Sequence, residues 1–88
     1  MKHAGDKALD DLECMIETIR GYPGLREKKR GVFYLRSKAL LHFHEDPAGL
    51  YADLRSGEDW VRFAVNTETE RKQCLSALKK FLTDLQVV

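Results

Sequence analysis

The spacing of apolar residues changes twice along this chain of 88 residues, and no other feature of the sequence constrains the fold as strongly. Near both ends, apolar residues recur with the 3.6-residue period of an amphipathic helix, whereas the middle alternates apolar and polar residues as a strand does. A chain of this length has room for one modest core. The pattern therefore predicts one α+β domain, residues 1–88, with helices packed on a sheet.

Two helices are predicted, one at each end. The first spans Asp6–Arg20 and ends where Pro23 and its neighbouring glycines cannot continue the helical hydrogen bonds. The second follows a capping box, in which Thr67 and Glu70 each accept from the other's backbone N–H. Its apolar stripe ends at Leu85. We expect residues 1–5, ahead of the first helix, to be frayed.

Four short strands are predicted between the helices. Each is rich in β-branched or aromatic residues, and turn-forming residues separate most of them. Their ranges are Val32–Arg36, Ala39–His44, Leu50–Arg55 and Trp60–Val65. Short connections favour antiparallel neighbours. The expected fold is thus two-layered, a helix, a four-stranded antiparallel meander and a helix, with both helices on one sheet face.

The two faces of this sheet differ in character. One parity is uniformly apolar, includes Ala39, and should meet the helices, whereas the other carries rings, imidazoles and charges besides Leu40. We call the second set the open face. Its candidate binding residues are Tyr34, Arg36, His42, His44, Tyr51, Asp53, Arg55, Trp60 and Arg62.

Turn lengths predict how the open-face residues pair. The expected cross-strand pairs are Arg55 with Trp60, Asp53 with Arg62, Tyr51 with His44, and His42 with Asp53. A three-residue turn near Ser37 would add Tyr34 opposite His42. Cross-strand neighbours have Cβ atoms about 4.5–5.5 Å apart, so such a row could share a ligand.

The open face favours a binding role. Tyrosine, tryptophan and arginine are the residue types that anchor protein interfaces, so a protein partner or a second copy of the chain is our leading hypothesis. The alternative is nucleic acid, whose bases stack on rings while cations meet its phosphates. A basic loop of Arg26, Lys28, Lys29 and Arg30 could add phosphate contacts.

A weak metal site is a further alternative. His42 and His44 are two residues apart on one strand, so both imidazoles lie on one side of the sheet, in a spacing that can hold zinc or iron. Glu45 and Asp46 follow at the turn, and His3 lies in the segment expected to be frayed. No third ligand is fixed by spacing, so metal binding stays a candidate role of this pair.

Motifs of the common enzyme classes are lacking. The sequence has no glycine-rich phosphate loop, no G-x-S-x-G, no H-E-x-x-H and no C-x-x-C. We therefore expect no cofactor and no catalytic residue. Cys74 falls in the apolar stripe and Cys14 outside its own helix's stripe, so neither a disulfide nor an oxidising compartment is expected. Without a signal peptide or a long apolar run, the prediction is a cytoplasmic protein with no membrane partner.

Part of the sequence resembles a group of small bacterial proteins without an assigned activity. The matching residues are Gly31–Tyr34, Leu40–Asp46, Gly49 and Ala52–Arg55, and the likeness covers residues 22–85. At the level of fold, the helix–meander–helix order is similar to a reduced frataxin-like or YjbR-like arrangement. The resemblance implies a fold and no catalytic or binding residue.

Overall fold

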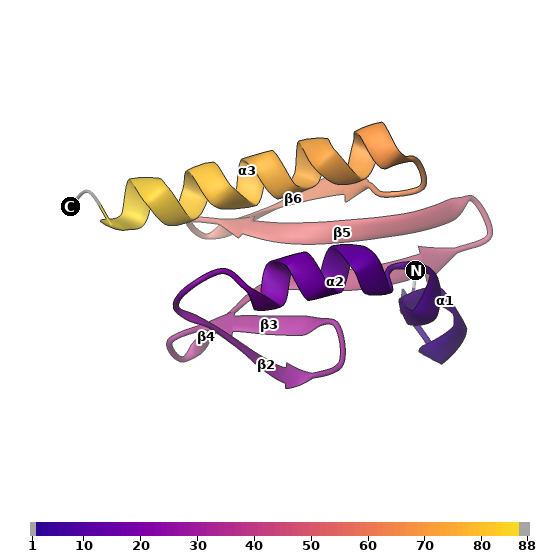
Figure 1. Cartoon of the computed structure of the whole chain (residues 1–88), viewed down its shortest axis with the longest axis horizontal. Coiled ribbons are helices and arrows are strands. Elements are labelled where there is room, and N and C mark those ends of the chain that lie inside the picture. The colour runs from indigo at the N-terminus through magenta and orange to yellow at the C-terminus, as the bar shows by residue number, and fades with distance from the viewer. Residues whose placement is uncertain (1, 87–88) are drawn as a thin grey trace.

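A computed structural model describes residues 2–86, with side chains described for residues 2–84 (Figure 1). Its elements are β1 (Lys2–His3), α1 (Asp6–Asp11), α2 (Glu13–Arg20), β2 (Leu25–Lys29), β3 (Val32–Leu35), β4 (Lys38–Asp46), β5 (Gly49–Ser56), β6 (Asp59–Ala64) and α3 (Glu68–Gln86). The α+β class with an antiparallel sheet is confirmed. No helix within these residues is long and apolar enough to cross a membrane.

The sheet has six strands, so the prediction of four was wrong. Its main path runs β2-β3-β4-β5-β6. The missed strand β2 has the sequence LREKK, whose charges hide its alternation. Leu25 and Glu27 are half-buried, whereas Arg26 and Lys28 are exposed. Charged side chains on an edge strand also discourage pairing with another chain.

The short strand β1 places residues 2–4 against β4, where we had expected a frayed segment over residues 1–5; residue 1 lies outside the described residues. It pairs antiparallel with β4, with Lys2 opposite Glu45 and His3 opposite His44. The Ala4 N–H donates to the Phe43 carbonyl at 3.1 Å. Three backbone positions in succession are thereby tied to β4, which is enough to fix the direction of the segment.

The first predicted helix is divided in two. At Leu12 the backbone leaves the helical region (φ −94°, ψ 4°), and α1 turns away from α2 (Figure 1). Leu12 is fully buried at the break. The change of direction there lets both Leu9 on α1 and Ile16 on α2 pack into the core. At α3 the capping box is confirmed, because Glu70 N–H donates to Thr67 Oγ1 and Thr67 N–H to Glu70 Oε1, both at 3.1 Å.

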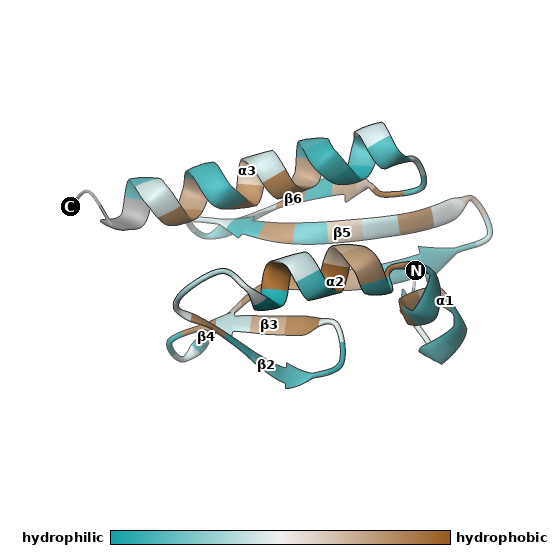
Figure 2. Cartoon of the chain, viewed as in Figure 1, coloured by the Kyte–Doolittle hydropathy of each residue, from teal (hydrophilic) through white to brown (hydrophobic). Residues whose placement is uncertain are grey.

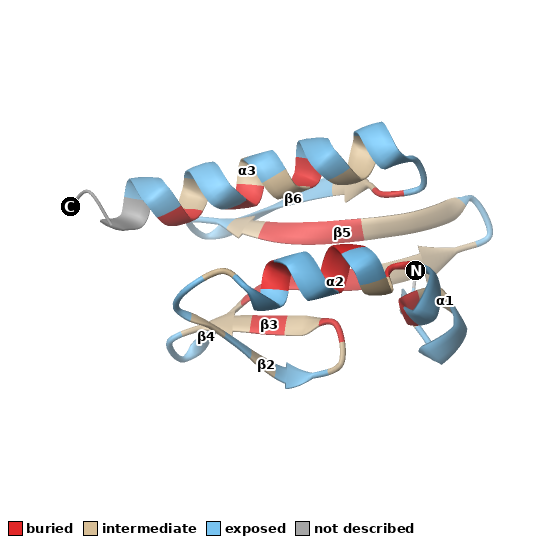
Figure 3. Cartoon of the chain, viewed as in Figure 1, coloured by how far each residue is buried: buried red, intermediate tan, exposed pale blue. Residues whose placement is uncertain are grey.

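A single hydrophobic cluster joins α2, α3 and one face of the sheet. Hydrophobic segments alternate with hydrophilic ones along both helices (Figure 2), and the buried segments include the middle of β3 and β5 (Figure 3). The fully buried large side chains are Phe33, Leu12, Ile16, Ile19, Leu41, Leu78, Val65 and Cys74. The side chain of Leu85, predicted to extend the α3 stripe, lies outside the described residues.

The β3–β4 hairpin differs from the prediction in turn and register. Its loop holds two residues, Arg36 and Ser37, instead of three, because Arg36 adopts the positive φ of 59° that a tight turn requires. A bulge then leaves Leu40 unpaired, buried in the core and off the open face, while Ala39 lies opposite Tyr34. Alternation had assigned Ala39 and Leu40 the other way round. A two-residue alternation cannot assign these faces correctly, because the bulge inserts one extra residue into the strand.

Replacing Arg36 with glycine tests this turn. A non-glycine residue in the left-handed region is strained by about 1–2 kcal/mol. Glycine avoids this strain but loses about 0.5–1 kcal/mol more backbone entropy on folding. We expect Arg36→Gly to raise the free energy of unfolding by about 0.5–1 kcal/mol in urea denaturation. Ser37→Gly, the matched control without a positive φ, should lower it. Destabilisation by Arg36→Gly would contradict the two-residue turn.

Candidate functional site

The register of β4, β5 and β6 brings the polar residues of the open face into rows. Each predicted pair in these strands is confirmed: His44 lies opposite Tyr51, His42 opposite Asp53, Asp53 opposite Arg62, and Arg55 opposite Trp60. The pairing of Tyr34 with His42 was wrong, because the bulge in β4 brings Val32 opposite His42. The central row is therefore Lys29, Val32, His42, Asp53 and Arg62.

Three imidazoles meet above this row. Because β1 pairs with β4, His3 lies beside His44, and their ring centroids are 4.9 Å apart. The rings of His42 and His44 are 4.6 Å apart, and those of His3 and His42 are 5.4 Å apart. One ring nitrogen from each residue lies within 4.8 Å of the other two. We call His3, His42 and His44 the triple-histidine cluster; they are all the histidines of the chain.

The cluster contains buried nitrogens that make no hydrogen bond among the described residues. These are Nδ1 of His42 and both ring nitrogens of His44. The side chain of His44 is 12% exposed, so water reaches it poorly. Leaving a buried polar atom unsatisfied costs about 1–3 kcal/mol. Such unpaired nitrogens in one place are the donors that a bound group would use.

Below the histidines lies a buried carboxylate. Asp53 is 6% exposed, and Arg62 binds it through two nitrogens, each at 2.8 Å. Asp53 Oδ2 is also 3.2 Å from Nε2 of His44, although the geometry does not make a hydrogen bond. Arg62 thus uses one lone pair of each carboxylate oxygen, and Asp53 can still accept a hydrogen bond from a neighbouring imidazole.

The surroundings shift the acid–base behaviour of both groups. Burial, helped by the adjacent His44, holds the pKa of His42 below its usual value, and Asp53 only partly opposes this. The hydrogen bonds from Arg62 hold the pKa of Asp53 below its usual value. At neutral pH the site therefore combines a neutral His42 with an ionised Asp53. A neutral imidazole is the form that ligates metals.

Two cation–aromatic pairs flank the cluster. The Arg55 guanidinium lies 4.5 Å from the Trp60 ring centre, and the Lys28 ammonium lies 4.4 Å from that of Tyr34. Trp60 is 39% exposed, and its ring centroid is 4.6 Å from that of His42. Trp60 is accordingly in contact both with a cation and with a histidine, whereas Tyr34 contacts a cation.

The predicted basic loop is not a loop. Arg26, Lys28 and Lys29 belong to β2, and only Arg30 follows it. Arg30 is bound to Asp10 at 2.8 Å and to Glu13 at 2.9 Å, so the acidic residues of the first two helices neutralise it. The charge of Arg30 is thus already paired within the chain, and the phosphate contact expected of it stays a prediction. Arg36 lies in the β3–β4 turn, outside the rows.

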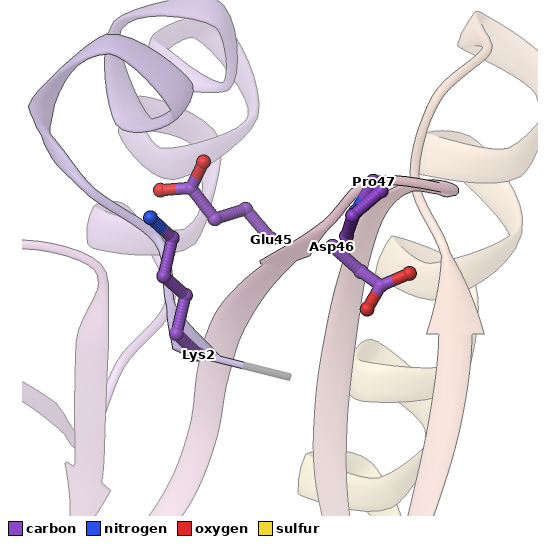
Figure 4. Close-up of a pocket in the computed structure, with 4 residues that line it drawn as sticks. All are labelled: Lys2, Glu45, Asp46 and Pro47. Atoms are coloured by element: carbon purple, nitrogen blue, oxygen red, sulfur yellow. The ribbon is translucent and has the colours of Figure 1, made fainter.

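The depression beside β1 does not form a second candidate site. One depression of about 590 Å³ is lined by Lys2, Glu45, Asp46 and Pro47. Its two carboxylates point in opposite directions (Figure 4). Glu45 accepts from the Gly5 N–H and Asp46 from the Ala48 N–H, so both already serve the backbone.

The cysteines behave as predicted. Cys74 is buried and Cys14 exposed, and both are free thiols. Burial raises the pKa of Cys74 to about 12, so its thiol is inert at neutral pH. Neither lies in the triple-histidine cluster.

Comparisons with known proteins indicate no function for this chain. Neither a protein-family model, nor a curated protein, nor a solved structure matches the chain. The frataxin-like or YjbR-like resemblance therefore stays a prediction at the level of fold.

The lowered pKa of His42 predicts how stability depends on pH. Because the unfolded chain binds this proton more readily than the folded one, the free energy of unfolding should fall as pH drops below about 6.5. Urea denaturation with a chelator, between about pH 8 and pH 5, should show this fall. His42→Gln should reduce it. An unchanged pH dependence in His42→Gln, with His3→Gln as the exposed-site control, would contradict the assignment.

Proposed function

We propose that this chain binds a divalent transition-metal ion, zinc above all, through His3, His42 and His44. The observation that carries the proposal is the triple-histidine cluster, with donor nitrogens within 4.8 Å of one another and three buried ring nitrogens that make no hydrogen bond among the described residues. Imidazole suits zinc, copper, iron and nickel. Three histidine ligands leave a fourth position for water or a ligand, as in catalytic zinc sites.

The distances allow a tetrahedral site after a small closure. With Zn–N bonds of about 2.0–2.1 Å, tetrahedral ligand nitrogens lie about 3.3 Å apart. The longest separation in the cluster must therefore shrink by about 1.5 Å. His42 and His44 stand on a long central strand, whereas His3 is exposed and belongs to the two-residue strand β1. His3 is the ligand that moves.

The electrostatics allow a cation at this place, because the nearest charges offset each other. Ionised Asp53 lies beneath the cluster, 3.2 Å from His44, and offsets the positive charge of Arg62. Carboxylates next to ligating histidines commonly orient the ring and raise its basicity. Asp53 is suited to that role once His44 turns its other nitrogen to the metal.

The interaction with a protein partner or second copy, favoured by the sequence, rests on weaker support. The exposed large apolar residues of the described chain are Trp60 and Val61. They are consecutive in β6 and pair with Arg55 and Leu54, so they lie on opposite faces of the strand. They do not form one apolar patch, which a stable interface of this kind needs.

Cobalt and zinc titrations test the metal site. We expect one Co²⁺ per chain with the strong visible absorption of a tetrahedral site, displaced by Zn²⁺. His3→Ala removes a ligand at an exposed position and should weaken zinc binding, measured by calorimetry, by more than the roughly 10–100-fold typical of a second-shell change.

Lys2→Ala is the matched control, because Lys2 is the exposed neighbour of His3 in β1. It should bind zinc as the parent chain does. Equal affinity of His3→Ala and the parent chain would contradict the three-histidine site, as would zinc binding that leaves the imidazole NMR signals of His42 and His44 unmoved.

A further inference from the structure

A second row of open-face residues crosses the whole sheet beside the triple-histidine cluster. Arg26 lies opposite Tyr34, Tyr34 opposite Ala39, and Arg55 opposite Trp60. Arg55 Nε donates to the Ala39 carbonyl at 2.8 Å, and this hydrogen bond links the residues on β2, β3 and β4 to those on β5 and β6. We call Arg26, Tyr34, Ala39, Arg55 and Trp60 the transverse row. It spans four strand spacings, about 19 Å.

The cations of this row differ from several other arginines of the described chain in having no acidic partner. Arg20, Arg30 and Arg71 each bind carboxylates. Arg26, Lys28 and Arg55 have no carboxylate within salt-bridge distance among residues 2–84, although Lys28 and Arg55 contact rings. Positive charge that the protein does not neutralise itself attracts a polyanion.

The order of residues in the row gives the class of polyanion. Across the sheet, Tyr34 on β3 lies between Arg26 on β2 and the small residue Ala39 on β4. Farther across, the Arg55 side chain on β5 stacks on the Trp60 ring on β6. Rings and guanidinium planes stack on bases, while the charges contact phosphates. An acidic peptide would satisfy the charges and leave the flat surfaces unused.

We propose that the transverse row, with Lys28 beside it, binds single-stranded nucleic acid, with bases on Tyr34 and the Arg55–Trp60 stack. A duplex hides its base faces, and a flat sheet offers no helix to enter a groove. No histidine belongs to the row, although the Trp60 ring contacts that of His42, so the test is made without a metal ion.

Trp60 makes the test direct, since it is the only tryptophan of the chain. A short oligothymidylate is titrated into the full chain at about 50 mM salt, with EDTA present so that failure bears on this surface alone. The expected result is quenching of Trp60 emission and weaker binding as salt rises. A duplex of equal length should bind at least fivefold more weakly.

Two matched double variants separate this row from general positive charge. Arg26→Ala with Lys28→Ala should lower the slope of log K against log salt by about 1.4, the value for two lost contacts to a single strand. Lys79→Ala with Lys80→Ala removes the same charge from exposed positions of α3 and should leave the slope unchanged. Trp60→Leu should weaken binding of a labelled strand, measured by anisotropy, about fivefold or more. Circular dichroism checks that each variant is folded.

Several results would overturn the proposal. These are no binding at the low salt concentration, equal affinity for duplex and single strand, equal losses in the two double variants, or binding without a change in Trp60 emission. Displacement of the strand by an equimolar acidic peptide would assign the surface to a protein partner instead.

Discussion

The antiparallel pairing of β4 on both of its edges determines where every polar group of the open face lies. On one edge β5 pairs with it from Leu41 to Asp46, and on the other edge β3 gives way to β1 beside His44. Because the side-chain period of a strand is two residues, a slip by one position in β5 would send Asp53 to the core and Leu54 to the open face. The hydrophobic core excludes that slip, since Leu54 and Ala52 are buried in it.

This constraint accounts for an unusual combination on one sheet. The face beneath the helices is apolar and closed, whereas the open face holds a buried carboxylate, its arginine and three imidazoles at the meeting of β1, β4 and β5. Burying Asp53 is costly unless a partner neutralises it, and Arg62 does so with two hydrogen bonds. No such partner satisfies the nitrogens of His42 and His44 within the described residues. A metal ion would take one nitrogen of each ring, with His3 of β1 moving toward it and β4 staying in place.

Sequence reasoning reached the α+β class, the capping box and the pairs of β4, β5 and β6, because these follow from strict periodicity and from turns with clear chemistry. It failed where a local geometry adds or removes a residue from the period. Neither the bulge at Leu40 nor the positive φ of Arg36 coincides with a glycine or asparagine, the residue types that would have indicated such geometry in the sequence. The strand β2 was hidden by its charges, since Glu27 faces the helices only because Arg20 of α2 binds it. The sequence did not predict that His3 lies next to His42 and His44, because a two-residue strand is too short to show a periodic pattern.

X-ray absorption at the zinc edge of the loaded, full-length chain tests the central claim most directly. The account predicts a first shell with three imidazole nitrogens at about 2.0–2.1 Å and one further light atom. It also predicts the loss of one imidazole from that shell in His3→Ala. A shell of oxygen atoms, or one that is unchanged in His3→Ala, would contradict the claim that β1 brings a third histidine to the other two.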